Sequence, residues 1–435
     1  MEAILIKTLQ LILSLSILVI VHECGHFLFA KIFKVRVEKF YLFFNPWFSL
    51  FKFRPKGSET EYGIGWLPLG GYVKISGMID ESMDKEALAQ PPQSWEFRSK
   101  PAGQRLLIMV GGVCMNLILA FFIYSIIVLR WGDSYIPIDK TPLYFSEVAH
   151  HAGFQDGDIL LAANQKQLTR YDELDLFRII DAKTVTVLRN NQQQTIALPK
   201  DFRSQFIASK TTLADIVPAE IDSLLPEGNA IKAGLEVGDK IVSLNDTETT
   251  AFSCFASQLS KYKDSIVQLG VIRNGEAIAL KVQVDSEGKI GFSTNRQSAT
   301  IVTRSANFFQ SFPMGFSLGL RKLSFYVLQL KLLFTKEGIQ NIGGFGAIGS
   351  LFPEKWNWMA FWNMTAFLSI VLGVMNLLPI PALDGGHVMF LLYETISGRQ
   401  PNEKFLEYAQ IAGMILLIVL LIYANGMDVV RAFFK

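Results

Sequence analysis

The chain has 435 residues, of which 50% are hydrophobic, and a mean hydropathy of +0.29. This composition is too apolar for an ordinary soluble enzyme and predicts a multi-pass integral membrane protein with several domains. The net charge of only +2 and the absence of a dense basic run exclude nucleic acid as a partner.

Four apolar stretches are long enough to cross a bilayer, which takes about 20 helical residues. They lie at residues 4–28, 104–130, 358–380 and 407–425. The segment 31–105 carries twelve Lys and Arg, so the positive-inside rule places it in the cytoplasm. Both termini and the long 131–350 region are then expected on the opposite, extracytoplasmic side.

The first apolar stretch contains an H-E-x-x-H pentapeptide, His22-Glu23-Cys24-Gly25-His26. On a helix the two imidazoles lie on one face and can share a zinc ion, and Glu23 beside them can take a proton from water. The alternative is two histidines that lie by accident near a helix end. Ionisable groups in a membrane span are costly and rarely without function, which favours zinc-dependent hydrolysis at membrane depth, near the cytoplasmic face.

Residues 61–75 contain two short strand-like runs separated by a Pro/Gly turn. They predict a β-hairpin, and its aromatic and glycine content predicts that it dips into the membrane. The alternative is a surface hairpin that does not touch a substrate.

The 131–350 region contains an internal repeat. The string from Ala152 to Leu160, A-G-F-Q-D-G-D-I-L, recurs 81 residues later as A-G-L-E-V-G-D-K-I, and an asparagine follows in both copies, Asn164 and Asn245. The signature resembles that of bacterial PDZ domains, which take peptides by strand addition. A generic Gly-Asp turn is the alternative for a single copy, but two copies in register favour tandem PDZ-like domains.

Segment 308–335 mixes apolar residues with Arg321, Lys322 and Lys331, which predicts an interfacial amphipathic helix rather than a fifth span. Pro313 and Gly315 predict a break near its start.

Two histidines leave a tetrahedral zinc site one protein ligand short if its fourth position stays open. The best candidate is Asp384, because Pro379 and Pro381 end the third span just before it and that span runs toward the same membrane face as the first. A helix-capping role is the alternative for Asp384. His387 is a less favoured ligand, three positions further on.

These motifs together resemble the site-2 protease family of zinc intramembrane proteases, over the whole chain. The resemblance implies zinc ligands at His22, His26 and Asp384, a general base at Glu23, and a substrate-binding role for Asn376, with Pro379 and Pro381 shaping that segment. A glycine-rich stretch at 343–349 also fits the family. The family's G-P-x-x-N motif lacks its proline here, at residues 112–116.

The fold class expected is an α-helical integral membrane protein with four transmembrane helices, a membrane-associated β-hairpin and two inserted PDZ-like α/β domains. The expected divisions are an N-terminal membrane part at 1–130, PDZ-like domains at 131–215 and 216–300, amphipathic linker helices at 301–356 and a C-terminal membrane part at 357–435.

The function that the resemblance implies is zinc-dependent endoproteolysis of transmembrane segments, such as those of anti-sigma factors or signal-peptide remnants, in a bacterial inner membrane. The expected partners are the lipid bilayer, a transmembrane protein substrate and peptide ligands of the PDZ-like domains. A non-catalytic PDZ scaffold and a metal transporter are the alternatives. The scaffold predicts that Glu23→Gln has no phenotype, and four spans leave little room for a transport pathway.

Overall fold

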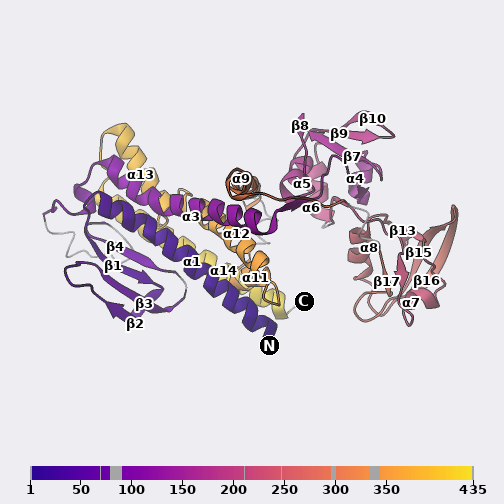
Figure 1. Cartoon of the computed structure of the whole chain (residues 1–435), viewed down its shortest axis with the longest axis horizontal. Helices are drawn as coiled ribbons and strands as arrows, with labels where there is room; N and C mark the ends of the chain where they lie inside the picture. Colours follow the sequence, from indigo (N-terminus) through magenta and orange to yellow (C-terminus); the bar gives the residue numbers. More distant parts are fainter. Residues whose placement is uncertain are drawn as a thin grey trace. The chain divides into compact units, whose positions relative to one another are not determined.

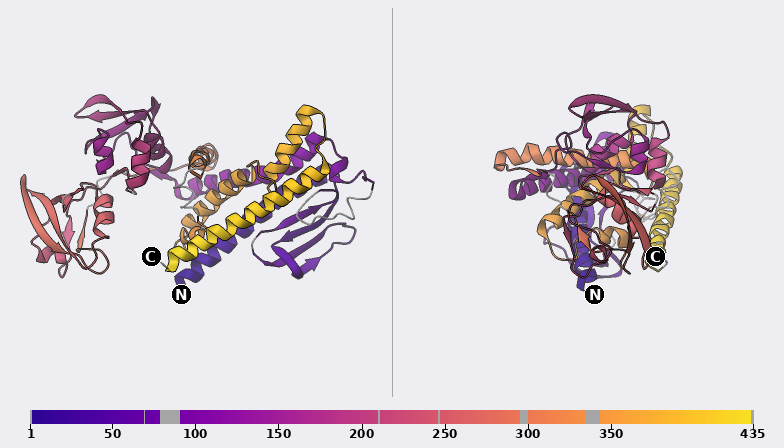
Figure 2. Two further views of the ribbon diagram at one scale, coloured as in Figure 1. Left: turned by 180° about the vertical axis from the view of Figure 1, so that it is seen from behind. Right: turned by 90° about the vertical axis from the view of Figure 1, so that its right-hand side faces the viewer.

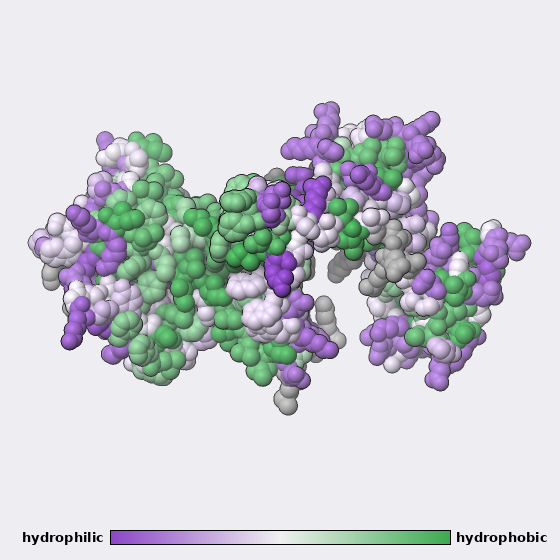
Figure 3. All heavy atoms as spheres, in the orientation of Figure 1, coloured by the Kyte–Doolittle hydropathy of each residue, from purple (hydrophilic) through white to green (hydrophobic). Residues whose placement is uncertain are grey.

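The computed structural model of the chain describes residues 2–68, 70–78, 91–209, 211–245, 247–294, 300–333 and 343–433. It divides into two compact units: unit 1 is Met1–Gly132 with Ser305–Lys435, and unit 2 is Asp133–Arg304. Residues 79–90 of the expected cytoplasmic segment and 334–342 of the expected linker lie outside the described residues. Hydrophobic residues cover the helices of unit 1, whereas hydrophilic residues are prominent on unit 2 (Figure 3).

Unit 1 combines long helices with one small sheet (Figures 1 and 2). Its elements are α1 (Glu2–Ile32), β1 (Val37–Leu42), β2 (Phe44–Phe53), β3 (Glu61–Leu67), β4 (Tyr72–Ile75), η1 (Phe97–Ser99), α3 (Ala102–Trp131), α9 (Phe308–Leu333), α11 (Phe345–Ser350), α12 (Trp358–Asn376), α13 (Asp384–Ser397) and α14 (Glu403–Phe433).

Four helices in the described part of the chain are long and apolar enough to cross a membrane, as predicted: α1, α3, α12 and residues Lys404–Arg431 of α14. The third is shorter than expected, since α12 ends at Asn376 rather than near residue 380. Pro379 and Pro381 have no backbone N–H to continue the helix, so an irregular segment leads to Asp384 at the start of α13.

Helix α3 is central to unit 1 and contacts α1, α9, α12 and α13. It approaches α1 closely at Gly111, where an added Cβ would lie 2.8 Å from the carbonyl oxygen of Gly25. Glycine on both helices permits this short separation. Helices α1 and α12 run parallel, because Leu18 and Phe361 share one core cluster while His22 and Asn376 meet further along both helices.

The predicted hairpin at 61–75 is wrong. Strands β3 and β4 do not pair with each other, because β1 lies between them in the order β2-β3-β1-β4. Strand β1 pairs parallel with β3 and antiparallel with β4. Strands β3 and β4 therefore lie two strand spacings apart, or about 10 Å, on either side of β1. Strand β4 is therefore an edge strand.

Helix α9 spans most of the expected amphipathic segment. It continues through Pro313, so the predicted break is wrong. Proline this near the start of a helix removes one hydrogen bond without ending the helix. Gly315 and Gly319 of α9 pack directly on α3, and Phe309 on another face is 83% exposed.

Unit 2 repeats one order of elements, except that helix α6 of the first copy has no counterpart in the second. The first copy contains β6 (Tyr144–Phe145), α4 (Glu147–His151), β7 (Ile159–Ala163), β8 (Lys166–Gln167), α5 (Glu173–Ile180), β9 (Thr184–Arg189), β10 (Gln192–Ala197), α6 (Phe202–Ser209) and β11 (Ala214–Asp215). The second contains β12 (Ser223–Leu224), α7 (Asn229–Lys232), β13 (Lys240–Leu244), β14 (Thr247–Glu248), α8 (Phe252–Leu259), β15 (Ile266–Arg273), β16 (Glu276–Gln283) and β17 (Phe292–Ser293). Strands β5 (Asp133–Tyr135) and β18 (Val302–Arg304) pair at the two ends of the unit.

The sheets of the two copies have equivalent orders, β8-β7-β9-β10 and β14-β13-β15-β16. The structure also explains the aspartate of the repeated Gly-Asp turn. Asp158 is buried and accepts hydrogen bonds from Arg189, and Asp239 is buried and accepts them from Arg273. Each turn is thus tied to a strand of its own sheet by a charged pair.

Candidate active site

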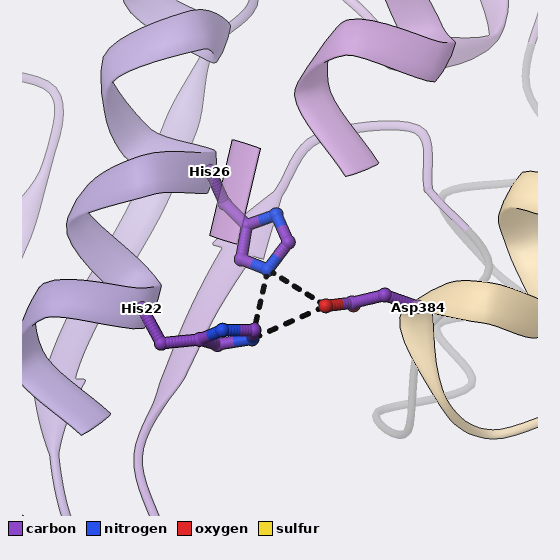
Figure 4. Close-up of side chains that lie close together, drawn as sticks. All are labelled: His22, His26 and Asp384. Carbon is purple, nitrogen blue, oxygen red and sulfur yellow. Dashed lines mark hydrogen bonds and ion pairs between the residues drawn. The ribbon is translucent and has the colours of Figure 1, made fainter. Parts of the chain in front are cut away.

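Three side chains from two distant segments converge in unit 1 (Figure 4). The Nε2 atoms of His22 and His26 lie 3.2 Å apart. Oδ2 of Asp384 lies 3.2 Å from Nε2 of His22 and 3.3 Å from Nε2 of His26. The histidines are on successive turns of α1, and Asp384 is the first residue of α13.

The three atoms form a nearly equilateral triangle that fits a zinc ion. Zinc–ligand bonds of about 2.0–2.1 Å in tetrahedral geometry place ligand atoms about 3.3 Å apart. Direct hydrogen bonds explain the arrangement less well, because Nε2 of His22 also has the amide nitrogen of Asn376 at 3.3 Å, which gives one ring nitrogen three polar neighbours. In the described part of the chain, this is the one group of three metal-ligating side chains that converges in this way.

The other ring nitrogens of both histidines face α3. Nδ1 of His26 donates to the carbonyl oxygen of Ile108 at 2.9 Å, and Nδ1 of His22 lies 3.2 Å from Nδ2 of Asn116. Gly112 lies between Ile108 and Asn116 on α3. A Cβ there would overlap Nε2 of His26 and lie 2.6 Å from Cε1 of His22, so only glycine leaves room for both rings.

A cavity of about 430 Å³ adjoins the triangle. Its walls come from α1, the edge strand β4, the segment before α13, and α14. Among its lining residues are Glu23, Tyr72, Val73, Asn376 and Gln410. Glu23, in the pentapeptide, and Val73 of β4 both line this cavity.

Tyr72 in β4 contributes a neutral hydroxyl to this cavity. Burial, together with the nearby Tyr41, raises the pKa of Tyr72 to about 12. The hydroxyl donates to Oδ1 of Asn45 at 2.9 Å, so it stays protonated at neutral pH and its proton is already engaged.

The structure brings together only part of the expected site. His22, His26, Asp384, Glu23 and Asn376 all line the cavity. His387 lines it too, without joining the triangle. Pro379 and Pro381 are not among its described lining residues, and the carbonyl oxygen of Pro381 packs directly on Gly413 of α14.

Helix α14 supports the segment that leads to Asp384. Oε1 of Gln410 accepts the backbone N–H of Ala382 at 3.1 Å. Ala382 has φ +79°, a left-handed conformation that is unfavourable for a residue other than glycine. Gln410 is 6% exposed. Sequence reasoning missed Gln410 and the histidine contact of Asn116, although a polar side chain in each of two apolar spans was the available signal.

Comparison with known proteins covers nearly the whole chain. Residues 10–420 match the family described as Peptidase family M50. The chain is 28% identical over 462 residues to a protein of Vibrio cholerae named "Putative zinc metalloprotease", a comparison that covers 99% of this chain and 100% of that protein. It is 28% identical over 453 residues to the "Regulator of sigma-E protease RseP" of Salmonella typhimurium, covering 97% and 98% of the two chains. The same identity and coverage hold for "Protease RseP" of Yersinia pestis.

Proposed function

We propose a mechanism and a substrate class for this chain, which belongs to peptidase family M50. It is an intramembrane zinc metalloprotease, and its substrates are membrane proteins. The resemblance to the site-2 protease family that the motifs indicated, and within it to the sigma-E regulator protease RseP, is confirmed. The residue roles, the orientation in the membrane and the choice of substrate are the proposal.

His22, His26 and Asp384 hold the zinc ion, and the observation that carries this assignment is the triangle of 3.2–3.3 Å between their ligand atoms. When bound there, zinc supplies Lewis-acid activation of the scissile carbonyl and of the attacking water. Glu23 accepts the proton of that water and later donates it to the leaving nitrogen. Its position in the wall of the adjoining cavity supports this role.

The substrate is a transmembrane segment that unwinds locally before cleavage. A helix hides its peptide groups in internal hydrogen bonds, so an unwound segment needs new partners at membrane depth. Strand β4 supplies them, because it is a sheet edge whose residues Tyr72–Ile75 line the cavity. Asn376 holds the substrate backbone near the triangle, and Pro379 and Pro381 shape the segment that carries Asp384.

The strand-pairing role is tested by disulfide cross-linking in a background without native cysteines. Val73→Cys on β4 should cross-link to a cysteine beside the cleavage position of a model transmembrane substrate. Lys52→Cys on β2, the opposite edge of the same sheet, is the matched control and should not. Equal cross-linking at both edges would show that β4 is not the specific partner of the substrate strand.

The protein lies in the bacterial inner membrane with the triangle near the cytoplasmic face, and unit 2 lies on the extracytoplasmic side. The twelve Lys and Arg between the first two spans support this orientation. The two PDZ-like domains at residues 131–215 and 216–300 fall within unit 2 except for residues 131 and 132, and they admit substrates by size or by binding a peptide. The repeated motif and the equivalent sheet orders support this. Unchanged selectivity between truncated and full-length substrates after deletion of residues 140–300 would contradict it.

The decisive experiment measures zinc content and cleavage of a model transmembrane substrate by purified wild type, Glu23→Gln and Asp384→Asn. Glu23→Gln should retain zinc and lose cleavage, because the base is removed and the ligands remain. Asp384→Asn should lose zinc. Full cleavage by either variant would reject the roles assigned to these residues. A wild-type protein that does not cleave the substrate, with a Glu23→Gln variant that has no phenotype, would favour the non-catalytic scaffold.

A further inference from the structure

Three residues of α3, each one helical turn from the next, face the two histidines of the triangle. Ile108 contacts His26 through its carbonyl oxygen, Gly112 leaves room for both rings, and Asn116 contacts His22. The spacing of four residues places all three on one face of the helix. The second span therefore forms a wall against which both histidines pack.

The contact with Ile108 sets the tautomer of His26. A backbone carbonyl oxygen only accepts, so Nδ1 of His26 must carry the proton and Nε2 keeps its lone pair. That lone pair is the one directed at the triangle, because Nε2 of His26 lies 3.3 Å from Oδ2 of Asp384.

His22 needs the same arrangement, and its partner is the carboxamide of Asn116. Nδ2 of Asn116 faces Nδ1 of His22, and Oδ1 has no hydrogen-bond partner among the described residues although it is buried. Asn116 is 0% exposed, so water does not reach it from bulk solvent. A half-turn of the amide presents Oδ1 to Nδ1 of His22 as an acceptor, which leaves Nε2 free to bind a metal.

We propose that Asn116 is a positioning residue that selects the metal-binding tautomer of His22. Its backbone carbonyl oxygen has a separate partner, since Oγ of Ser369 in α12 donates to it at 2.7 Å. Hydrogen-bond partners of this kind commonly change metal affinity by about 10–100-fold. The inference rests on the proposed zinc ligands, but it concerns a residue that does not touch the metal.

The test compares Asn116→Leu, Asn116→Asp and Ser369→Ala in the full-length protein in detergent. Zinc affinity is measured by competition with a chelator, and the absorption spectrum of the cobalt-substituted protein reports the ligand geometry. Asn116→Leu keeps the branched shape but has no acceptor, so its zinc affinity should fall by about 10–100-fold and its cobalt spectrum should change. Asn116→Asp keeps an acceptor, so its affinity should equal or exceed that of wild type.

Ser369→Ala is the matched control, because it removes a contact to the backbone of Asn116 and leaves the side chain intact. It should bind zinc as wild type does. If Asn116 only packs the helices, Leu will be tolerated better than Asp, and that order would overturn the inference. If Asn116→Leu does not fold, Asn116→Ala takes its place in the comparison with Asp. A wild-type protein without zinc would instead refute the proposed function.

Discussion

Asn376 at the end of α12 lies 3.3 Å from Nε2 of His22 in α1, although 354 positions separate the two residues in the chain. The contact joins the end of α12 to an interior turn of α1, at the point where Asp384 also lies. It shows how the cavity is assembled: α1 supplies two histidines and Glu23, and the break after α12 supplies the carboxylate. The surrounding helices determine whether these groups meet, and the following predictions address them.

Gly112→Ala should disrupt the triangle without disturbing α3. The new Cβ overlaps Nε2 of His26 and lies 2.6 Å from Cε1 of His22, so the rings must move apart. We expect zinc affinity to fall by at least about 10-fold, with an equal or larger loss of cleavage. Gly103→Ala on the same helix is the control, because no described atom lies within 4 Å of its new Cβ. Wild-type zinc affinity in Gly112→Ala would show that the rings tolerate a methyl group.

Gln410→Leu should weaken the site through the segment before α13. The variant removes the acceptor for the N–H of Ala382, which is held at φ +79°. Such a conformation is unfavourable by about 1–2 kcal/mol, so the released segment should relax and displace Asp384, two residues further on. Chelator competition should show a several-fold lower zinc affinity.

Ala382→Gly provides the matched comparison, because glycine adopts this conformation readily and keeps the N–H. It should bind zinc at least as well as wild type, and combined with Gln410→Leu it should recover part of the loss. Wild-type zinc affinity in Gln410→Leu alone would show that the contact from α14 does not support the metal site.

Asp428→Ala should release the glycine-rich segment from α14. Oδ2 of Asp428 accepts the backbone N–H groups of Gly344 and Ala347 at 3.0 and 2.9 Å, at the start of α11. Loss of a carboxylate at a helix start costs about 1 kcal/mol. The amides of Gly344 and Ala347 should exchange hydrogen faster, while zinc affinity stays unchanged because α11 contributes nothing to the triangle. Equal exchange in variant and wild type would argue that these bonds do not hold the segment.

His150 should make the stability of unit 2 depend on pH. Its Nε2 lies 3.0 Å from Oδ1 of Asp156, and Glu248 lies 3.8 Å from Nδ1. The hydrogen bond to Asp156 raises the pKa of His150 above 6.5, against the opposing effect of burial. Burial raises the pKa of Asp156, but hydrogen bonds with His150 and with the backbone N–H of Phe145 outweigh it and hold that pKa below 3.8.

The raised pKa of His150 stabilises the folded state fully below pH 6.5, and this contribution is lost as pH rises through the folded value. The lowered pKa of Asp156 stabilises the folded state above pH 3.8, and this contribution is lost as pH falls through the folded value. Both contributions are complete between these limits. Calorimetry of the full chain should show that His150→Ala destabilises unit 2 at pH 6 by about 1 kcal/mol or less, and by less at pH 9. The exposed His151→Ala is the control; a pH-independent effect of His150→Ala would reject the ion pair.

Much of the fold was predictable where the signal is local. The four spans follow from the length of their apolar runs, and the repeat in unit 2 follows from a nine-residue motif whose turn geometry depends on neighbouring residues. The predicted hairpin at 61–75 is wrong because the local sequence does not show which of several strands will pair. Strand β1 supplies buried Val37 and Tyr41 to the sheet and takes the place between β3 and β4.

The sequence by itself determined the chemistry of this protein: two histidines at helical spacing, a base beside them, and a carboxylate after a proline break in another span. Tertiary structure decided the rest. The meeting of His22 with Asp384 and Asn376 depends on the parallel packing of α1 and α12. The wall of Ile108, Gly112 and Asn116 and the support from Gln410 depend on how closely α3 and α14 approach. Such contacts join residues far apart in the chain, so no local sequence pattern predicts them.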